Sequence, residues 1–236
     1  LDPACGSGNF LTETYISLRK LENEALRALS DQIMLGDVTN PIQVSIGQFY
    51  GIEINDFAVT VAKTALWIAE SQMMKETEDI MHMSLDFLPL KSYANIVEGN
   101  ALRMDWESVV PKRELNYIMG NPPFVGFSLM SSEQKKDVAL IFPGTKNVDY
   151  VACWYMKAIE FAAESRIECA FVSTNSICQG EIVPVLWPKL LTKGIIINFA
   201  YRTFIWTSEA KEKAAVHCII IGFSLLSRPQ KIIFDG

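Results

Sequence analysis

The hydrophobic and polar positions along the chain follow two different periods, which predicts strands connected by helices. Apolar residues recur at helical spacing in residues 9 to about 30, 57–74, 148–164 and 182–191. Short apolar runs predict strands at residues 49–54, 94–97, 115–119 and 168–173, then an antiparallel pair at 195–205 and 215–223. This order is typical of an α/β fold with a doubly wound, mostly parallel sheet, here ending in an antiparallel C-terminal strand pair.

Two of the expected connections are unusually long. Residues 75–93 follow the second helix, and residues 124–146 separate the fourth strand from the third helix. Long loops in compact domains often carry function or move, so we expect these two segments to be functional or mobile.

Composition narrows the class of protein. Of the 236 residues, 50% are hydrophobic and 20% are charged, so the chain can bury a packed core. The formal net charge of −6 argues against a wholly basic protein that wraps nucleic acid, although a local basic cleft is compatible with it. The longest apolar runs, such as residues 218–223, are too short to cross a bilayer, so we expect no membrane contact.

Cysteine and histidine usage argues against a metal centre. The chain has five cysteines without a C-x-x-C pair and only two histidines, which favours neither a zinc site nor a disulfide framework. This usage is typical of a protein in the reducing cytoplasm. We expect every thiol to pack as a small apolar side chain, at Cys5, Cys153, Cys169, Cys178 and Cys218.

A glycine-rich turn lies where a first strand would pass into the first helix. In Asp2-Pro3-Ala4-Cys5-Gly6-Ser7-Gly8-Asn9-Phe10, two glycines let the backbone approach a ligand closely, and the following helix presents its amide groups. Glu53, at the end of the next strand, can accept both hydrogen bonds of a ribose diol. Glu53 comes 45 residues after Gly8, against roughly 20 in a compact dinucleotide fold, so the first helix and its loop must be extended. An ordinary strand-to-helix turn explains the glycines equally well.

Asn100 follows the third predicted strand, in Glu98-Gly99-Asn100-Ala101. Its amide can donate and accept at once, as the recognition of an adenine edge requires. A Gly-Asn turn explains the same residues without a ligand, and on this motif alone the turn is the better interpretation.

Asn121-Pro122-Pro123-Phe124 ends the fourth predicted strand. Two prolines fix the backbone and cannot continue a sheet ladder, which leaves a rigid ledge with an amide, a free carbonyl and an aromatic ring. A proline-rich turn with an exposed Phe is the common alternative. The expected strand order places this ledge beside the glycine turn, at the edge where open α/β sheets bind ligands.

Taken together and in this order, the motifs resemble those of amino-group DNA methyltransferases that use S-adenosylmethionine. DPACGSGNF, a later ribose-binding Glu, GNAL and NPPF match the adenine-N6 class, and above all the methylase part of fused type IIG restriction–modification enzymes. The resemblance implies a Rossmann-like class I methyltransferase fold, with residues 1–236 as one catalytic domain. It also implies transfer of a methyl group to the 6-amino group of adenine in DNA.

The resemblance implies roles for individual residues. The S-adenosylmethionine cofactor would be bound by Asp2, Ala4, Gly6, Gly8, Phe10, Glu53, Ile54, Asn100 and Ala101. The catalytic ledge would be Asn121, Pro122, Pro123 and Phe124. Asn121 and the Pro122 carbonyl would accept the hydrogens of the target amine, and Phe124 would stack on the target base. Phe204 or Trp206 is a candidate for the opposite wall of the base pocket, and an ordinary core or hairpin position explains them equally well.

The chemistry of methylating an aromatic amine agrees with these roles. Such an amine is a poor nucleophile because its lone pair is delocalised into the ring. Two acceptors outside the base plane favour a pyramidal nitrogen whose lone pair points at the methyl donor. The target base must leave the duplex to reach them. Methylation of cytosine carbon-5 would instead need a thiolate nucleophile, usually after proline, and the chain has no Pro-Cys dipeptide.

Two other functions remain open at this point. A methyltransferase acting on RNA or on a protein glutamine amide would use a similar Asn-Pro-Pro-aromatic ledge, because an amide nitrogen presents the same chemical problem. A degenerate, non-enzymatic interaction module is the third possibility, and the intact Gly6, Gly8, Glu53, Asn121 and Phe124 argue against it.

The expected partner is double-stranded DNA with a flipped target adenine. Phosphate contacts dominate nucleic-acid affinity, and an acidic chain is poorly suited to make them alone. We therefore expect the DNA contacts to be completed by a target-recognition region absent from this chain. The chain opens on Leu1-Asp2-Pro3 without an initiator methionine, and we interpret it as a fragment that also lacks an upstream segment of the methionine pocket.

Overall fold

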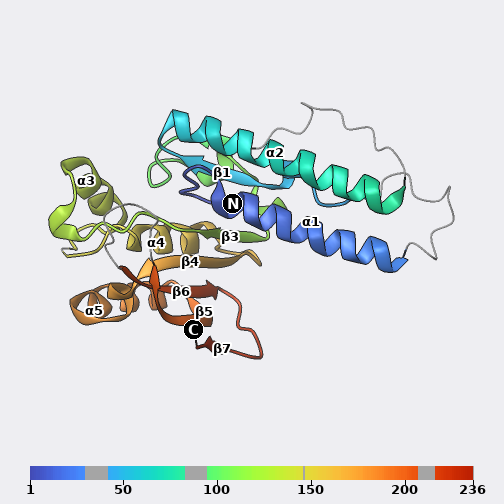
Figure 1. Ribbon diagram of the computed structural model, residues 1–236. Helices are drawn as coiled ribbons and strands as arrows, with labels where there is room; N and C mark the ends of the chain where they lie inside the picture. The colour runs from blue at the N-terminus through green and yellow to red at the C-terminus, as the bar shows by residue number, and fades with distance from the viewer. Residues whose placement is uncertain (30–41, 83–94, 146, 207–215, 236) are drawn as a thin grey trace. The chain divides into compact units, whose positions relative to one another are not determined.

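The computed structural model describes residues 1–29, 42–82, 95–145, 147–206 and 216–235. The chain divides into two compact units. Asp2 and residues 4–99 form one, which we call the N-terminal unit, and Leu1, Pro3 and residues 100–236 form the C-terminal unit. Each unit has a sheet of its own (Figure 1).

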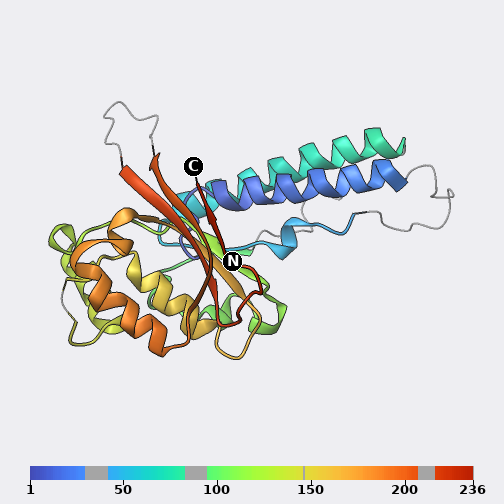
Figure 2. The same ribbon diagram turned by 90° about the horizontal axis from the view of Figure 1, so that it is seen from below.

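The N-terminal unit combines two long helices with a two-stranded parallel sheet. Its elements are α1 (Asn9–Leu29), the 3-10 helix η1 (Ile46–Gln48), β1 (Tyr50–Glu53), α2 (Asp56–Met81) and β2 (Asn95–Glu98). β1 and β2 are paired in parallel along their whole length, and Asp2 forms a parallel bridge with Gly51. The helices α1 and α2 lie side by side (Figures 1 and 2). The Asn55 side chain caps the start of α2 by accepting a hydrogen bond of 2.9 Å from the Ala58 N–H.

The interface between α1 and α2 contains a buried polar cluster. The Arg19 guanidinium donates to the Thr77 hydroxyl at 2.6 Å, and this hydroxyl donates to Asn23 Oδ1 at 2.7 Å. All three side chains are fully buried. This cluster explains why α2 continues to Met81, whereas apolar spacing predicted its end at residue 74. Polar side chains anchor the last turns of α2, so the spacing of apolar residues cannot predict where this helix ends.

The C-terminal unit is built on a five-stranded mixed sheet. Its strands are β3 (Tyr117–Gly120), β4 (Glu168–Thr174), β5 (Ile196–Trp206), β6 (Val216–Ser224) and β7 (Ile232–Phe234), in the order β3-β4-β6-β5-β7. β3 pairs with β4 and β5 with β7 in parallel, while β6 is antiparallel to both β4 and β5. The predicted α/β class and the antiparallel pair near the C-terminus are thus confirmed.

Helices complete this unit. They are η2 (Trp106–Ser108), η3 (Lys112–Glu114), η4 (Phe127–Leu129), α3 (Ser132–Ile141), α4 (Ala152–Phe161), η5 (Asn175–Cys178), η6 (Gly180–Ile182) and α5 (Val183–Thr192). α4 and α5 cover one face of the sheet (Figure 2). The core there is aromatic: Tyr155 of α4 stacks on Phe223 at 5.0 Å between ring centroids and meets Phe171 edge-on at 5.4 Å.

Three expectations about this unit are wrong. Residues 124–146 are not a single loop, because they contain α3, whose Ser131 and Gln134 exchange the hydrogen bonds of a capping box. α4 begins at Ala152 rather than at residue 148, and just before it the Tyr150 N–H donates to the Val125 carbonyl at 3.0 Å. Cys178 is exposed at the end of η5, whereas the other four thiols are buried as expected.

None of the described helices has the length and hydropathy needed to cross a membrane. Residues 83–94, the larger part of the first long connection, lie outside the described residues.

Candidate active site

The glycine turn of the N-terminal unit leads from a short strand-like segment into α1. The Asp2 backbone exchanges two hydrogen bonds of 2.9 Å with β1. Gly6 and Gly8 then take φ values of 54° and 84°, which residues with a side chain rarely adopt. A Cβ atom on Gly8 would lie 2.9 Å from Cβ of Ala62, so the close approach of α1 and α2 depends on this glycine. A Cβ atom on Gly6 would meet no atom within 4 Å, so the backbone there is open to a ligand.

Glu53 extends from the end of β1 to the same turn. One carboxylate oxygen accepts the Gly6 N–H at 2.9 Å and the other accepts the Asn55 N–H at 3.0 Å. A carboxylate has about four lone-pair sites, so about two acceptor positions are left for a ligand. The structure therefore brings Gly6 and Glu53 together, as their expected joint role requires, and their function toward a cofactor stays a prediction.

Exposed apolar side chains follow Glu53 directly. Ile54 is 67% exposed and Phe57 is 73% exposed. The family motifs point to Ile54, whereas the apolar spacing predicts Phe57 only as the start of a helix. Large apolar side chains in this position offer a surface for a flat ring.

Burial raises the pKa of two groups in the turn. Desolvation raises the pKa of the Asp2 carboxyl to about 7, against the opposing effect of its hydrogen bond from the Ala4 N–H. Desolvation also raises the pKa of the Cys5 thiol, and the neighbouring carboxyls of Asp2 and Glu53 raise it further. Cys5 is therefore a packed thiol and not a nucleophile.

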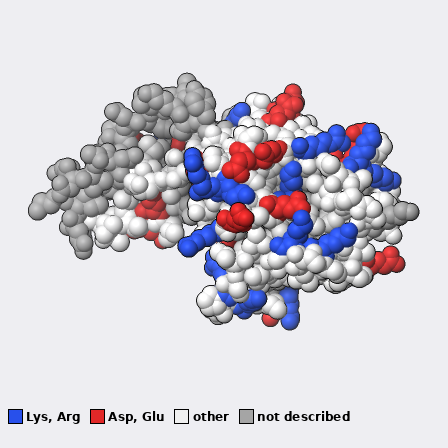
Figure 3. Space-filling view, turned by 180° about the vertical axis from the view of Figure 1, so that it is seen from behind, with Lys and Arg blue, Asp and Glu red and all other residues white. Residues whose placement is uncertain are grey.

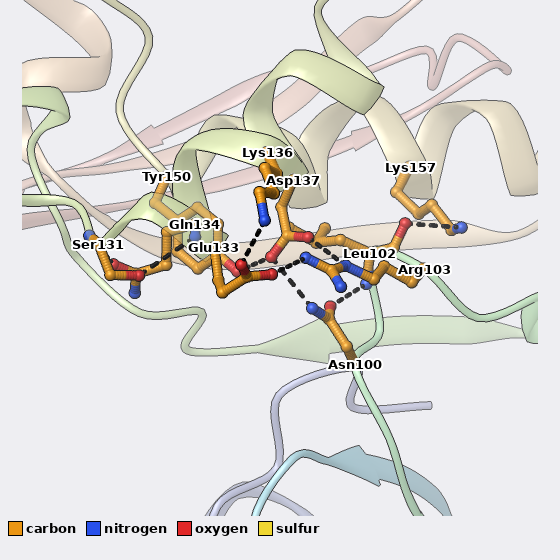
Figure 4. Close-up of polar contacts among 10 residues, drawn as sticks. All are labelled: Asn100, Leu102, Arg103, Ser131, Glu133, Gln134, Lys136, Asp137, Tyr150 and Lys157. Atoms are coloured by element: carbon orange, nitrogen blue, oxygen red, sulfur yellow. Dashed lines mark hydrogen bonds and ion pairs between the residues drawn. The ribbon is translucent and has the colours of Figure 1, made fainter.

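In the C-terminal unit, Asn100 forms a turn and also has a side-chain partner (Figure 4). Its Oδ1 accepts the Leu102 N–H at 2.9 Å, which is the local turn that the Gly-Asn sequence predicts. Its Nδ2 donates to the Asp137 carboxylate at 3.0 Å. Ala101, the neighbouring candidate, is buried, and its carbonyl accepts the Trp106 indole N–H at 2.8 Å.

Asp137 of α3 is a residue that sequence analysis missed. Its side chain is buried and accepts three hydrogen bonds, from Asn100, from Arg103 Nε at 2.6 Å and from the Tyr150 hydroxyl at 2.7 Å. Desolvation, and next the hydrogen bond to Asp137, raise the pKa of Tyr150. The only sequence signal was indirect: the capping box at Ser131 and Gln134 could have shown that this segment is a helix.

The proline ledge ends β3. Pro122 is buried, Pro123 is exposed, and Asn121 and Phe124 are half-buried. Asn121 Oδ1 is buried and has no hydrogen-bond partner. A buried acceptor without a donor costs free energy, so it is a place where a ligand N–H would be stabilising.

Beyond the ledge, Gly126 lies beside Asp149, whose carboxylate accepts the Ser176 hydroxyl at 2.8 Å.

Phe204 and Trp206 lie near the end of β5, where they pair with Cys218 and Val216 of β6. Their ring centroids are 6.3 Å apart, and Trp206 is 37% exposed. Both are placed in a hairpin, and their role as a wall of a base pocket stays a prediction.

The structure groups the candidate residues by unit. Those from Asp2 to Ile54 belong to the N-terminal unit, and those from Asn100 to Trp206 belong to the C-terminal unit. The expected juxtaposition of the glycine turn and the proline ledge stays a prediction. Among the described residues, no cluster of three or more His, Cys, Asp or Glu could hold a metal ion.

Comparison with known proteins decides the family. Residues 1–235 match the family described as MmeI, DNA-methyltransferase domain. The chain belongs to this family. It is 43% identical over 240 residues to DNA methyltransferase A of Bacillus subtilis (strain 168), which covers 99% of this chain and 27% of that protein.

Solved structures agree with membership in the MmeI methyltransferase family. A type IIL restriction–modification enzyme, MmeI in complex with DNA, superposes with a TM-score of 0.93 at 47% identity, over 100% of this chain and 32% of that chain. A putative class I S-adenosylmethionine-dependent methyltransferase from Listeria monocytogenes, at a TM-score of 0.53 and 11% identity, covers 100% of this chain and 57% of its own. The second match shows the fold alone. The expected class I methyltransferase fold and the resemblance to DNA methyltransferases are confirmed, while the chain spans only 27% and 32% of the length of these two relatives, DNA methyltransferase A and MmeI.

Proposed function

We propose that this chain transfers a methyl group from S-adenosylmethionine to the 6-amino group of adenine in DNA, as the methylase part of a restriction–modification system in the cytoplasm. Membership in a DNA-methyltransferase family supports the reaction type. One observation supports an amino group as the methyl acceptor. Oδ1 of Asn121 is buried without a hydrogen-bond partner, so it is an acceptor suited to an N–H. The chain has no Pro-Cys dipeptide, which argues against methylation at cytosine carbon-5.

The residues of the N-terminal unit fit the cofactor. The lone pairs that Glu53 has left suit the two ribose hydroxyls, and the open space at Gly6 lets the backbone approach the methionine part. The binding site for the methionine part would be completed by Asp2, Ala4, Gly8 and Phe10. The exposed Ile54 would cover one face of the cofactor's adenine. Asn100 and Ala101 would lie at the adenine edge. When bound, S-adenosylmethionine supplies an electrophilic methyl group on a sulfonium.

The residues of the proline ledge would activate the amine. Asn121 Oδ1 and the Pro122 carbonyl would accept its two hydrogens and so hold the nitrogen lone pair out of conjugation with the ring. The two prolines fix the position of both acceptors, so little reorganisation is needed when charge develops on the nitrogen. The mechanism needs no covalent intermediate, which agrees with the burial of Cys5, Cys153, Cys169 and Cys218.

Aromatic side chains would hold the flipped base. The half-buried Phe124 can stack on it and offset part of the cost of unstacking it from the duplex. Phe204 or Trp206 would form the second wall. Both rings lie at the end of a strand and expose part of their surface, which is compatible with such a contact.

We propose that this chain does not bind DNA alone, and its net charge of −6 supports this proposal. On the face shown in Figure 3, Lys and Arg side chains are interspersed with Asp and Glu. Phosphate binding requires concentrated positive charge. We therefore propose that double-stranded DNA is held largely by parts of the full-length protein outside these 236 residues, including a target-recognition region.

Parallel methyl-transfer assays test the substrate class. The full-length protein is incubated with S-adenosylmethionine carrying a radiolabelled methyl group and with duplex DNA, ribosomal RNA or a protein with an accessible glutamine amide. We expect label in DNA, and a much slower incorporation of label into DNA when Asn121 is replaced by Ala. Preferential labelling of RNA or protein would overturn the choice of DNA and favour the alternative methyltransferases.

A further inference from the structure

The short helix η5 follows the end of β4 and is anchored within the C-terminal unit. Ile177 is fully buried, and its carbonyl accepts the indole N–H of Trp187 in α5 at 2.7 Å. Asn175 and Ser176 are half-buried, and each has a hydrogen-bond partner in a different segment of the chain. η5 therefore has a fixed place from which its polar side chains hold other segments.

On one side, η5 holds the segment that follows the proline ledge. The Ser176 hydroxyl donates to the Asp149 carboxylate at 2.8 Å, and this carboxylate lies beside Gly126. The N–H of the residue after Asp149 donates to the Val125 carbonyl at 3.0 Å. Gly126 is only two residues beyond Phe124, so these contacts restrict the chain directly behind the Phe124 ring.

On the other side, η5 holds a β-bulge. Between Tyr201 and Phe204, two residues of β5 lie opposite one residue of β6, so the regular ladder is interrupted there. Thr203 is one of these two residues, and its hydroxyl donates to Asn175 Oδ1 at 2.9 Å. A bulge changes the direction of the side chains next to it, and the residue that follows Thr203 is Phe204. The Thr203–Asn175 hydrogen bond therefore helps to set the direction of the Phe204 ring.

The ledge and Phe204 lie at the same edge of the C-terminal sheet. β3 and β4 are parallel, and β5 runs in the same direction because β4 and β5 are both antiparallel to β6. Thr174 and Phe204 both pair with Cys218, so they are two strand spacings, or about 10 Å, apart. Since β4 lies between β3 and β5 in the sheet, η5 begins between the ledge and Phe204.

We propose that Asn175 and Thr203 are positioning residues for the target base: their hydrogen bond fixes the bulge that aims Phe204, while η5 also holds the segment behind Phe124. The inference rests on the proposed methyl transfer to a flipped adenine and deepens it, because it selects Phe204 rather than Trp206 as the second wall. Phe204 is the ring that directly follows the bulge. Two walls at a set spacing hold the amine in line with the methyl donor, and the rate of transfer is sensitive to that alignment.

Matched variants of Thr203 test this role in the full-length protein. Thr203→Val keeps the branched shape but removes the hydroxyl, and Thr203→Ser restores the hydroxyl. We expect Thr203→Val to lower the single-turnover rate of methyl transfer to duplex DNA by about tenfold to a hundredfold, and Thr203→Ser to recover most of it. The dissociation constant of S-adenosylmethionine should not change.

Thr192→Val is the control for the loss of an exposed hydroxyl. Thr192 and Thr203 are both exposed, and the Thr192 hydroxyl donates to the Lys189 carbonyl at 2.8 Å within α5. We expect the two Val variants to have similar melting temperatures, because each loses one exposed hydrogen bond. Only Thr203→Val should lower the transfer rate.

Double variants show whether Thr203 acts through Phe204. Phe204→Ala should slow the transfer by itself, since it removes one wall of the base pocket. If Thr203 acts by aiming this ring, adding Thr203→Val to Phe204→Ala should slow the transfer further by less than about twofold. Asn175→Ala should slow the wild type as Thr203→Val does, and the two together should have no larger effect, because they remove the same hydrogen bond.

Each outcome bears on one step. A wild-type rate in Thr203→Val, an equal loss of rate in Thr192→Val, or no recovery in Thr203→Ser would overturn the inference and leave the proposed methyl transfer intact. A full effect of Thr203→Val in the Phe204→Ala protein would also overturn it. A wild-type rate in Phe204→Ala would remove Phe204 from the base pocket, and the inference with it. If the wild type transferred no methyl group to DNA, the proposed function itself would fail.

Discussion

Among single residues, Asp2 lies in the glycine turn and is almost completely buried. Desolvation raises its pKa from 3.8 to about 7. Because the folded-state value is the higher one, the carboxyl stabilises the fold fully at pH below about 4, and this contribution is lost as the pH rises through about 7. The Asp2→Asn variant has no carboxyl group at this position and therefore lacks this pH dependence.

We therefore expect the cofactor-free wild type to lose stability relative to Asp2→Asn between about pH 4 and about pH 7. The measurement is the melting temperature of both proteins over this range. Curves that stay parallel would show that Asp2 is already ionised in the folded protein.

Asn121 is the residue on which the chemistry depends most. Replacing it by Ala removes one fixed acceptor of the amine, and loss of such a group typically lowers turnover by roughly 10²–10³-fold. We expect this loss in the single-turnover rate of methyl transfer, with the dissociation constant of S-adenosylmethionine nearly unchanged. Asn116→Ala is the matched control, because the Asn116 side chain is exposed, and it should leave the rate unchanged. A normal rate in Asn121→Ala would refute the assigned role.

At the level of elements, the strand-to-helix turn makes different demands on its two glycines. Both have positive φ, so Ala at either position costs about 1–2 kcal/mol of backbone strain. Only at Gly8 would the new methyl group collide with α2, at Ala62. We expect Gly8→Ala to lower the free energy of unfolding by about 1–3 kcal/mol more than Gly6→Ala does. Urea denaturation measures this difference, and equal losses would contradict the close helix contact.

Elements with a strong apolar period could be predicted from the sequence, and the others could not. β1, β4 and β6 agree with expectation because their buried residues are mostly apolar. α1 and β5 also lie where they were expected, although α1 buries Arg19 and Asn23 and the one buried residue of β5 is Asn198. α3 buries only Asp137 and Val138, so it has almost no apolar period. β7 has three exposed residues and depends on its pairing with β5.

The residues of the candidate site, too, could be predicted from the sequence only in part. Gly6, Glu53 and Asn121 could be selected because their chemistry is visible in short motifs. Asp137 could not, because its role depends on donors 34 to 37 residues away at Arg103 and Asn100. Contacts of this kind are set by tertiary packing and leave no local pattern.

On the scale of the whole molecule, the chain covers 27% and 32% of two family relatives. We expect the 236-residue chain alone to bind S-adenosylmethionine weakly and to methylate little DNA, since the remaining contacts would come from outside it. Calorimetric titration of the chain beside the full-length protein measures this. Submicromolar binding by the chain alone would contradict the expectation.

The central claim, methyl transfer to an amine held by the ledge at Asn121, is tested most directly by nucleoside mass spectrometry. Duplex DNA is treated with the full-length protein and S-adenosylmethionine carrying a trideuterated methyl group, then digested to nucleosides. The account predicts that the label appears in N6-methyladenine and that, at equal reaction times, far less of it appears with Asn121→Ala. Label in a methylated cytosine, or undiminished N6-methyladenine in the variant, would contradict it.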